Sequence, residues 1–444
     1  MTANPLLAPY TRRIALRGIA ATGAGAAAAM LPFAAPAIAG EAAAQWPGVE
    51  RFVRSHVEAR RVPGMVAAMG FGQAAPDYVS AGARTFEGDG AVGRDTLWRI
   101  YSMTKPVTGL ATMLCIEDGL FELDQPLHEI LPAFRTMRVQ KTYDGPISAD
   151  NLEPAARPIT IRHLLTHTAG LGYTIIQNGP IKAAYSRAGI VPVSASRLAM
   201  AQDLLGGRPA RSLEMFADNL AELPLVRQPG TRWSYSVGLD LLGRVIEVAS
   251  GESFDSFLQR RIFDPVDMSS TFFRVPRSEA SRLAGNYFLM GGLPLPMDLP
   301  QSSVFLDPPA FPFGGAGLVS SARDYDRFLR MLAGLGEIDG RRVASEATIR
   351  TATSDLFPET LASNGRFTAN GRTFGFGAGG LVGQGETEGL FGWFGAAGTV
   401  GLVNMRYGLR HTLMVQYMPA ESYDIQQRFP AVVAEDAAVL AAAA

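Results

Sequence analysis

Tyr101-Ser102-Met103-Thr104-Lys105-Pro106 leads into the apolar run Leu110-Ala111-Thr112-Met113-Leu114-Cys115-Ile116, which predicts a helix. The stretch places a hydroxyl and one of the chain's three lysines three positions apart at the start of that helix. Side chains at this spacing share one helical face. A serine is a weak nucleophile until a base takes its proton, and a partly desolvated lysine can do this without a histidine. Ser102 and Lys105 therefore predict acyl transfer through a covalent intermediate.

Composition indicates a sizeable globular enzyme. The 444 residues are 47% hydrophobic and 18% charged, with a formal net charge of -1. No charge pattern of a nucleic-acid-binding protein is present, so we expect no nucleic-acid partner. Cys115 is the only cysteine, which excludes an intramolecular disulfide and a cysteine-based metal cluster. Its apolar surroundings favour a buried helix face over a reactive thiol.

The first 39 residues have the features of an export signal. Thr11-Arg12-Arg13-Ile14-Ala15-Leu16-Arg17 precedes an Ala- and Gly-rich stretch, and small-residue cleavage patterns follow at Ala35-Pro36-Ala37 and Ala37-Ile38-Ala39. We predict a twin-arginine signal peptide over residues 1–39 and a periplasmic or secreted enzyme, with an uncleaved anchor as the alternative. Pro32 and Pro36 disfavour a permanent span, and no later segment reaches spanning length, so no stable membrane span is expected.

Periodicity divides the remaining chain into strand-rich ends and a mainly helical middle. We predict strands over 65–72 and 77–82 near the beginning, and strands over 372–381, 398–405 and 412–417 near the end. The clearest predicted helices are 161–166, 212–220, 239–249, 254–262, 322–335 and 426–440. Residues 137–158 and 287–312 are proline-marked and irregular. Such long loops usually form lids or substrate walls.

Two further segments can complete a serine site. Gly-x-Ser-x-Gly is absent, which argues against the nucleophile elbow and the Ser-His-Asp triad of α/β-hydrolases. Tyr235, in Trp233-Ser234-Tyr235-Ser236-Val237-Gly238, can act as base or proton relay beside a lysine ammonium. Gly392-Trp393-Phe394-Gly395-Ala396-Ala397-Gly398 has glycines that allow a strand edge to approach substrate closely. A backbone N–H of that edge and the N–H of Ser102 make a two-donor oxyanion hole.

His163 and His167 raise the alternative of a metal site, because at a spacing of four they share a helical face. No third ligand follows at a suitable spacing. We therefore expect both histidines to make hydrogen bonds at a helix end, and we expect neither a metal nor an organic cofactor.

Five blocks in this order resemble the class C β-lactamase superfamily of penicillin-recognising serine hydrolases, and most of all its family VIII carboxylesterases. The blocks are Tyr101-Ser102-Met103-Thr104-Lys105-Pro106, Ile159-Thr160-Ile161-Arg162-His163-Leu164-Leu165-Thr166-His167-Thr168-Ala169-Gly170, Trp233-Ser234-Tyr235-Ser236, Phe313-Gly314-Gly315-Ala316-Gly317-Leu318 and Gly392-Trp393-Phe394-Gly395-Ala396-Ala397-Gly398-Thr399. The resemblance covers nearly the whole chain after the signal.

The resemblance implies a β-lactamase/transpeptidase-like α+β fold. An antiparallel sheet flanked by helices would come from residues 45–101 and 316–444, and a mainly helical domain from residues 102–315, with the active site at their junction. The implied roles are nucleophile for Ser102 and proton transfer for Lys105 and Tyr235. The N–H groups of Ser102 and Ala396 would form the oxyanion hole.

Two departures from the family pattern concern the substrate. Lactamases and D-Ala-D-Ala peptidases of this superfamily usually carry Tyr-x-Asn, where this chain has Val237, and Lys-Thr-Gly, where it has Trp393-Phe394-Gly395. Loss of the cation and gain of an aromatic wall favour neutral esters over anionic lactams. We therefore expect an esterase for small-molecule substrates, with Trp393, Phe394 and Gly395 at the substrate. The alternatives are a β-lactamase or D-amino-acid peptidase with the same nucleophile, and a penicillin-binding-like sensor or scaffold with little turnover.

Overall fold

The computed structural model of the chain describes residues 45–88, 90–369 and 371–443. The signal peptide predicted over residues 1–39 lies outside these described residues. In the part that the structure describes, no helix combines the length and the apolar character needed to cross a membrane.

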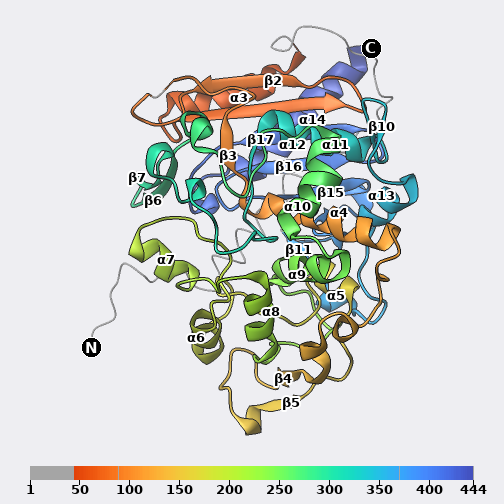
Figure 1. Cartoon of the computed structure of the whole chain (residues 1–444). Coiled ribbons are helices and arrows are strands. Elements are labelled where there is room, and N and C mark those ends of the chain that lie inside the picture. Colours follow the sequence, from red (N-terminus) through yellow and green to blue (C-terminus); the bar gives the residue numbers. More distant parts are fainter. Residues whose placement is uncertain (1–44, 89, 370, 444) are drawn as a thin grey trace.

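A seven-stranded antiparallel sheet joins the two ends of the described chain (Figure 1). Its order is β13-β14-β15-β16-β17-β1-β2. In the pairing of β1 with β17, Val66 lies opposite Met414 and Phe71 opposite Leu409. Every residue of β1 is buried, which matches its unbroken apolar sequence. The strands are β1 (Gly64–Phe71), β2 (Asp77–Gly82), β13 (Gly375–Phe376), β14 (Leu381–Val382), β15 (Leu390–Phe394), β16 (Val400–Asn404) and β17 (Leu409–Met414).

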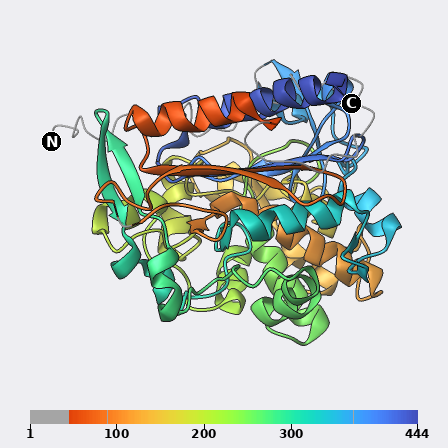
Figure 2. The ribbon, with the colours of Figure 1, turned by 90° about the horizontal axis from the view of Figure 1, so that it is seen from above.

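Helices cover both faces of this sheet. Figure 2 shows α3 (Pro47–Glu58) and α14 (Ile425–Ala443) side by side on one face and α12 (Ala322–Ala333) on the other. The carboxylate of Asp436 in α14 accepts the N–H groups of Gly48 and Val49, at 3.0 and 2.9 Å, in the first turn of α3. These N–H groups have no partner inside their own helix, so the last helix of the chain caps the first described one.

The chain between β2 and β13 is mainly helical, and α5, α6 and α8 with β4 and β5 lie in the lower half of Figure 1. Two small antiparallel pairs, β4–β5 and β6–β7, interrupt it, and both lie in the stretches 137–158 and 287–312 that the sequence indicated as irregular, apart from residue 286. The helices are α4 (Thr104–Glu117), α5 (Ile161–Leu165), α6 (Gly179–Arg187), α7 (Ala199–Leu205), α8 (Leu213–Ala221), α9 (Gly238–Ser250), α10 (Phe254–Leu258) and α11 (Asp264–Val266). The hairpin strands are β4 (Arg138–Gln140), β5 (Leu152–Pro154), β6 (Asn286–Met290) and β7 (Leu293–Asp298).

Short elements complete the fold. β3 (Leu97–Arg99) pairs with β8 (Val319–Ser321) and leads directly into the serine segment. The others are α13 (Glu346–Ala352), β9 (Glu337–Ile338), β10 (Arg341–Arg342), β11 (Thr368–Ala369), β12 (Arg372–Thr373) and a π-helical turn, Gln259–Phe263. The antiparallel sheet with flanking helices and the helical middle form the fold that the family resemblance implies.

The prediction was wrong where the chain turns within a predicted element. The strand predicted over 372–381 is instead the three short strands β12, β13 and β14, because residues 377–380 reverse the chain. Gly379 has φ +73°, a left-handed conformation, and the Gly377 N–H donates to the Gly380 carbonyl at 2.8 Å. The helix predicted over 254–262 is confirmed, because α10 passes without a break into the π-helical turn.

A buried ion pair anchors the strand before the serine. The Arg99 guanidinium, at the end of β3, is fully buried and donates from Nε to Asp298 Oδ2 at 2.7 Å. Its Nη2 also donates to Ser303 Oγ at 3.1 Å, and Asp298 Oδ1 accepts the Val304 N–H at 3.0 Å. Both charged groups are buried and make several hydrogen bonds. Removing either group would leave the other as a buried charge without its counter-ion.

We expect Asp298→Asn to lower the free energy of unfolding by about 3 kcal/mol, because the buried Arg99 charge then loses its counter-ion. Urea unfolding followed by circular dichroism measures the change. Glu50→Gln is the matched control, since it neutralises the partner of Arg54 in a solvent-exposed pair and should cost less than about 1 kcal/mol. Equal effects of the two substitutions would contradict this account.

Candidate active site

Ser102 lies in a single 3-10 turn, Tyr101–Met103, between β3 and α4. Tyr101 has φ +41°, which is unusual for a residue other than glycine and costs on the order of 1–3 kcal/mol. Burial of the Tyr101 ring and a 2.9 Å hydrogen bond from Asn286 Nδ2 to its hydroxyl hold this conformation. The sharp turn presents Ser102, which is partly exposed, at the start of α4.

Lys105 lies one turn further along and is wholly buried. Its Nζ donates to Ser102 Oγ at 3.2 Å and to the carbonyl oxygen of Gly315 at 2.7 Å. The same ammonium lies over two aromatic rings, 4.5 Å from the ring centroid of Tyr235 and 5.6 Å from that of Tyr173. The structure thus brings together Ser102, Lys105 and the ring of Tyr235, three residues that the sequence placed in the site.

Asp240, which the sequence analysis did not select, binds the Gly315 peptide whose carbonyl accepts the hydrogen bond from Lys105. It lies in the first turn of α9, only 1% exposed, and its Oδ1 accepts the Gly315 N–H at 2.8 Å. A Cβ at position 315 would be 2.6 Å from Asp240 Oδ2, so any side chain there would displace the Asp240 carboxylate. Burial raises the pKa of Asp240 to about 7, although Lys105 and the Gly315 N–H oppose the rise. The sequence offered one signal that could have identified Asp240. It is a single acid on the apolar face of a strongly amphipathic helix, five residues after Tyr235.

Tyr235 lies just before α9 with its side chain 5% exposed. Its hydroxyl oxygen accepts a hydrogen bond from Trp393 Nε1 at 3.1 Å. Trp393 belongs to β15 and is 3% exposed, so the indole ring is largely enclosed. Trp233 stacks on the Tyr235 ring with centroids 6.0 Å apart and planes at 22°. The structure therefore places Trp393 against the phenol hydroxyl.

The two histidines have different positions, and the expectation for them was only half right. His163 makes hydrogen bonds at a helix end as predicted, because its Nδ1 accepts the Thr160 N–H and its own N–H donates to Thr160 Oγ1 at the start of α5. His167 lies beyond the end of α5 with φ +55°, so the two do not share a helical face. Its Nδ1 is 2.9 Å from Ser236 Oγ, and its ring centroid is 4.8 Å from that of Tyr235. Burial and Lys105 lower its pKa well below the usual value, so it is neutral.

The end of β15 passes close to the serine turn. A Cβ at position 395 would lie 2.5 Å from the Ile100 carbonyl oxygen, so Gly395 is required for this approach. Ala396 follows in an exposed turn, and in the described chain its N–H donates to no other group. Phe394 is 6% exposed, and Val237, at the start of α9, is fully buried. Gly395 thus lies against Ile100, which directly precedes the serine turn, and Ala396 is the next residue along the chain.

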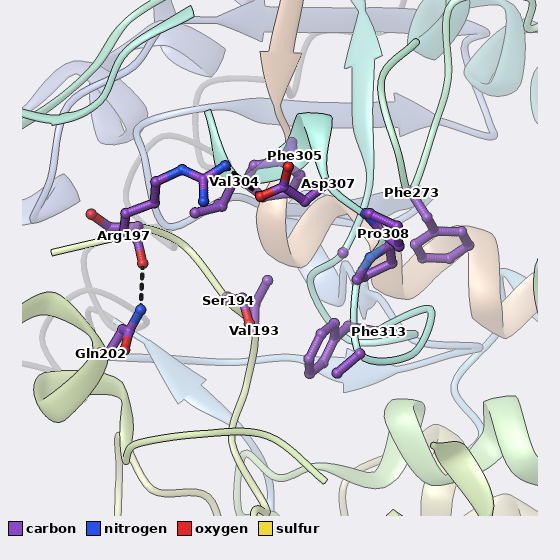
Figure 3. Close-up of a pocket in the computed structure, with 14 residues that line it drawn as sticks. Val193, Ser194, Arg197, Gln202, Phe273, Val304, Phe305, Asp307, Pro308 and Phe313 are labelled. Carbon is purple, nitrogen blue, oxygen red and sulfur yellow. Dashed lines mark hydrogen bonds and ion pairs between the residues drawn. The ribbon is translucent and has the colours of Figure 1, made fainter. Parts of the chain in front are cut away.

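Two cavities lie near these residues. One, of about 370 Å³, opens between residues 193–197 and 304–317, where Arg197 forms an ion pair with Asp307 (Figure 3). Its lining includes neither Ser102 nor Tyr235. The other, of about 240 Å³, has Tyr235 itself in its wall. Of the two cavities, only the second therefore shares a residue with the candidate site.

Comparisons with known proteins show relatives of this chain and a solved structure with the same fold. Protein Rv1367c of Mycobacterium tuberculosis is 33% identical over 361 residues, which cover 77% of this chain and 83% of the relative. A lovastatin esterase of Penicillium rubens is 31% identical over 325 residues, covering 68% of this chain and 72% of the relative. The solved structure of EstCE1, a hydrolase with promiscuous acyltransferase activity, superposes with a TM-score of 0.69 at 24% identity, covering 88% of this chain and 98% of that structure.

A family model gives the assignment. The model described as Beta-lactamase matches residues 49–434, which include the serine turn, the Tyr235 segment and β15. The match thus spans all the segments that form the candidate site and nearly all of the described residues. By sequence and by fold, the chain belongs to the beta-lactamase family.

Proposed function

We propose that the chain is a serine hydrolase that cleaves carboxylic esters through an acyl-enzyme on Ser102. The observation that carries this proposal is the 3.2 Å contact between the buried Lys105 Nζ and the partly exposed Ser102 Oγ. A nucleophile with an enclosed amine beside it is the arrangement that covalent catalysis requires. The relative named lovastatin esterase supports an ester as substrate.

In the acylation step, Ser102 Oγ forms a bond to the carbonyl carbon of the ester. The pair formed by Tyr235 and Lys105 reacts in the form that holds one proton fewer than a phenol and an ammonium together. It takes the proton of Oγ as the carbonyl oxygen becomes an oxyanion. The N–H groups of Ser102 and Ala396 stabilise that negative charge. When the tetrahedral intermediate collapses, the bond to the alcohol oxygen breaks, and the leaving oxygen takes the proton from the pair.

In the deacylation step, water takes the place of the alcohol. The pair of Tyr235 and Lys105 accepts a proton from the water as its oxygen bonds to the acyl carbon. The bond to Ser102 Oγ then breaks, the proton returns to Oγ, and the carboxylic acid leaves. The hydrogen bond from Lys105 to the Gly315 carbonyl holds the amine at the same position through both steps.

Two side chains favour esters over β-lactams. Val237 offers no amide with which to hold an acylamido group, and it is fully buried. Trp393 offers no cation, and its N–H is directed at Tyr235. A site without these two polar contacts loses little when the substrate is a simple ester.

Ser102→Ala should reduce hydrolysis of p-nitrophenyl butyrate by about 10³-fold or more, because no other group forms the acyl-enzyme. A fluorophosphonate probe should add one adduct to the wild type and none to the variant, as read by intact mass. Ser278→Ala, an exposed serine outside the site, is the control and should keep full activity. A wild-type protein without adduct would favour a binding protein, and faster cleavage of nitrocefin than of the ester would favour a β-lactamase.

The substitution Trp393→Phe tests whether the indole N–H positions Tyr235 or whether the ring only lines the substrate site. The N–H of Trp393 donates to the Tyr235 oxygen and stabilises negative charge there when the Tyr235–Lys105 pair is ready to accept a proton, so we expect kcat of Trp393→Phe to fall about tenfold while KM for p-nitrophenyl butyrate stays within about twofold. Trp98→Phe is the matched control, since the Trp98 Nε1 is buried without a partner among the described residues and its ring lies in β3, away from Tyr235; it should leave kcat unchanged. A raised KM with unchanged kcat would show that Trp393 only lines the substrate.

We also infer export by the twin-arginine pathway, with residues 1–39 as the signal. The support is the Arg12-Arg13 pair, its flanking residues and the small-residue cleavage patterns. N-terminal sequencing of protein recovered from the periplasm or medium should give a start close to residue 40. An exported protein that begins at Met1, or unchanged export of an Arg12→Lys/Arg13→Lys variant, would contradict this inference.

A further inference from the structure

The cavity beside Tyr235 is strongly basic. Its volume is about 240 Å³, and its lining includes Arg227, Arg232 and Arg366 but no aspartate or glutamate. Trp233 and Tyr235, whose rings stack with centroids 6.0 Å apart, form one part of its wall. A cavity of this size holds one part of a small molecule, while the rest of that molecule extends along the site.

The arginines differ in how far their charges are already compensated. Arg366 donates to Asp355 Oδ2 at 2.7 Å, but that carboxylate also accepts from Gln384 Nε2 and from backbone N–H groups of Phe357 and Phe376. Arg227 lies over the ring of Tyr143 at 4.1 Å. Arg232 is exposed and forms no ion pair with any carboxylate that the structure describes.

We propose that this cavity binds a carboxylate carried by the substrate, so that the preferred substrate is an anionic ester. The proposal rests on the proposed esterase function and specifies its substrate class. A guanidinium presents two parallel N–H donors that match the two oxygens of a carboxylate. The positive charge of Arg232, which no described carboxylate pairs, also attracts an anion to this concave surface.

This assignment revises the substrate expected from the sequence. The loss of a lysine at the position of Trp393 removes a cation from β15 and favours neutral esters. The arginine cavity restores positive charge on a different wall, next to Tyr235 and formed by residues 227–235 and 364–368. Tyr235 belongs both to this cavity wall and to the contact with Trp393 of β15, so the positive charge lies next to the candidate site.

Two pairs of probes test the proposal, each an acid and its uncharged amide. On the alcohol side we compare 4-acetoxybenzoate with 4-acetoxybenzamide, and on the acyl side mono-p-nitrophenyl glutarate with p-nitrophenyl glutaramate, each corrected for spontaneous hydrolysis. In at least one pair, kcat/KM should be higher for the acid. Arg232→Gln should lower that acid-to-amide ratio about tenfold, and raised NaCl should lower it in the wild type.

Arg51→Gln is the control, because it removes the same charge from an exposed residue of α3 on the far face of the sheet. It should leave the ratio unchanged. An equal loss for acid and amide in Arg232→Gln, or an acid-to-amide ratio at or below one in both pairs, would overturn the proposal. Cleavage of the ester bond in the two amide-bearing probes would in that case still uphold the esterase function.

Binding can be measured apart from turnover. In Ser102→Ala, calorimetry should show tighter binding of the preferred acid than of its amide, and Arg232→Gln in the same background should remove the difference. Equal affinities for acid and amide in Ser102→Ala would contradict the carboxylate site even if the wild type proves to be an esterase. A wild type that hydrolyses none of the four esters would instead refute the proposed function.

Discussion

The burial of Lys105 is the constraint on which the site depends. A lysine ammonium removed from water carries a large desolvation cost unless polar groups replace the water. Lys105 forms no ion pair with the carboxylates that the structure describes. Its partners are the Gly315 carbonyl, the Ser102 hydroxyl and the faces of two tyrosine rings. Each of these partners comes from a different segment, so the need to solvate one amine brings those segments together.

The Gly315 peptide connects this cation with a buried acid. Its carbonyl accepts from Lys105 and its N–H donates to Asp240, so the two charges act on each other through one peptide unit. On the other side, Gly395 lets β15 approach the Ile100 carbonyl and brings Trp393 to the Tyr235 hydroxyl. Glycines at these two places allow the backbone itself to form the walls of the site.

Local patterns in the sequence were sufficient for much of the fold. The strands predicted over 65–72 and 77–82 are confirmed as β1 and β2, and the helices α9, α12 and α14 lie within a few residues of their predictions. Spacing alone put Ser102 and Lys105 on one face. The role of Asp240 and the neutral His167 depend on which segments meet in space, and no local period encodes that. The arginines of the Tyr235 cavity come from separate stretches of the chain for the same reason.

The pairing of the chain's ends also sets an order for folding during synthesis. β1 cannot acquire its partner β17 until the ribosome has made nearly the whole chain, and the Gly48 N–H meets Asp436 across 388 positions. Contacts of such long sequence separation form slowly, because the intervening chain must first be confined. The serine turn is made early, but β15 and the Ala396 N–H follow only at the end. A nascent chain therefore carries Ser102 without β15 and without the second N–H donor that we propose for the oxyanion hole, so we expect it to become active only once translation is almost complete.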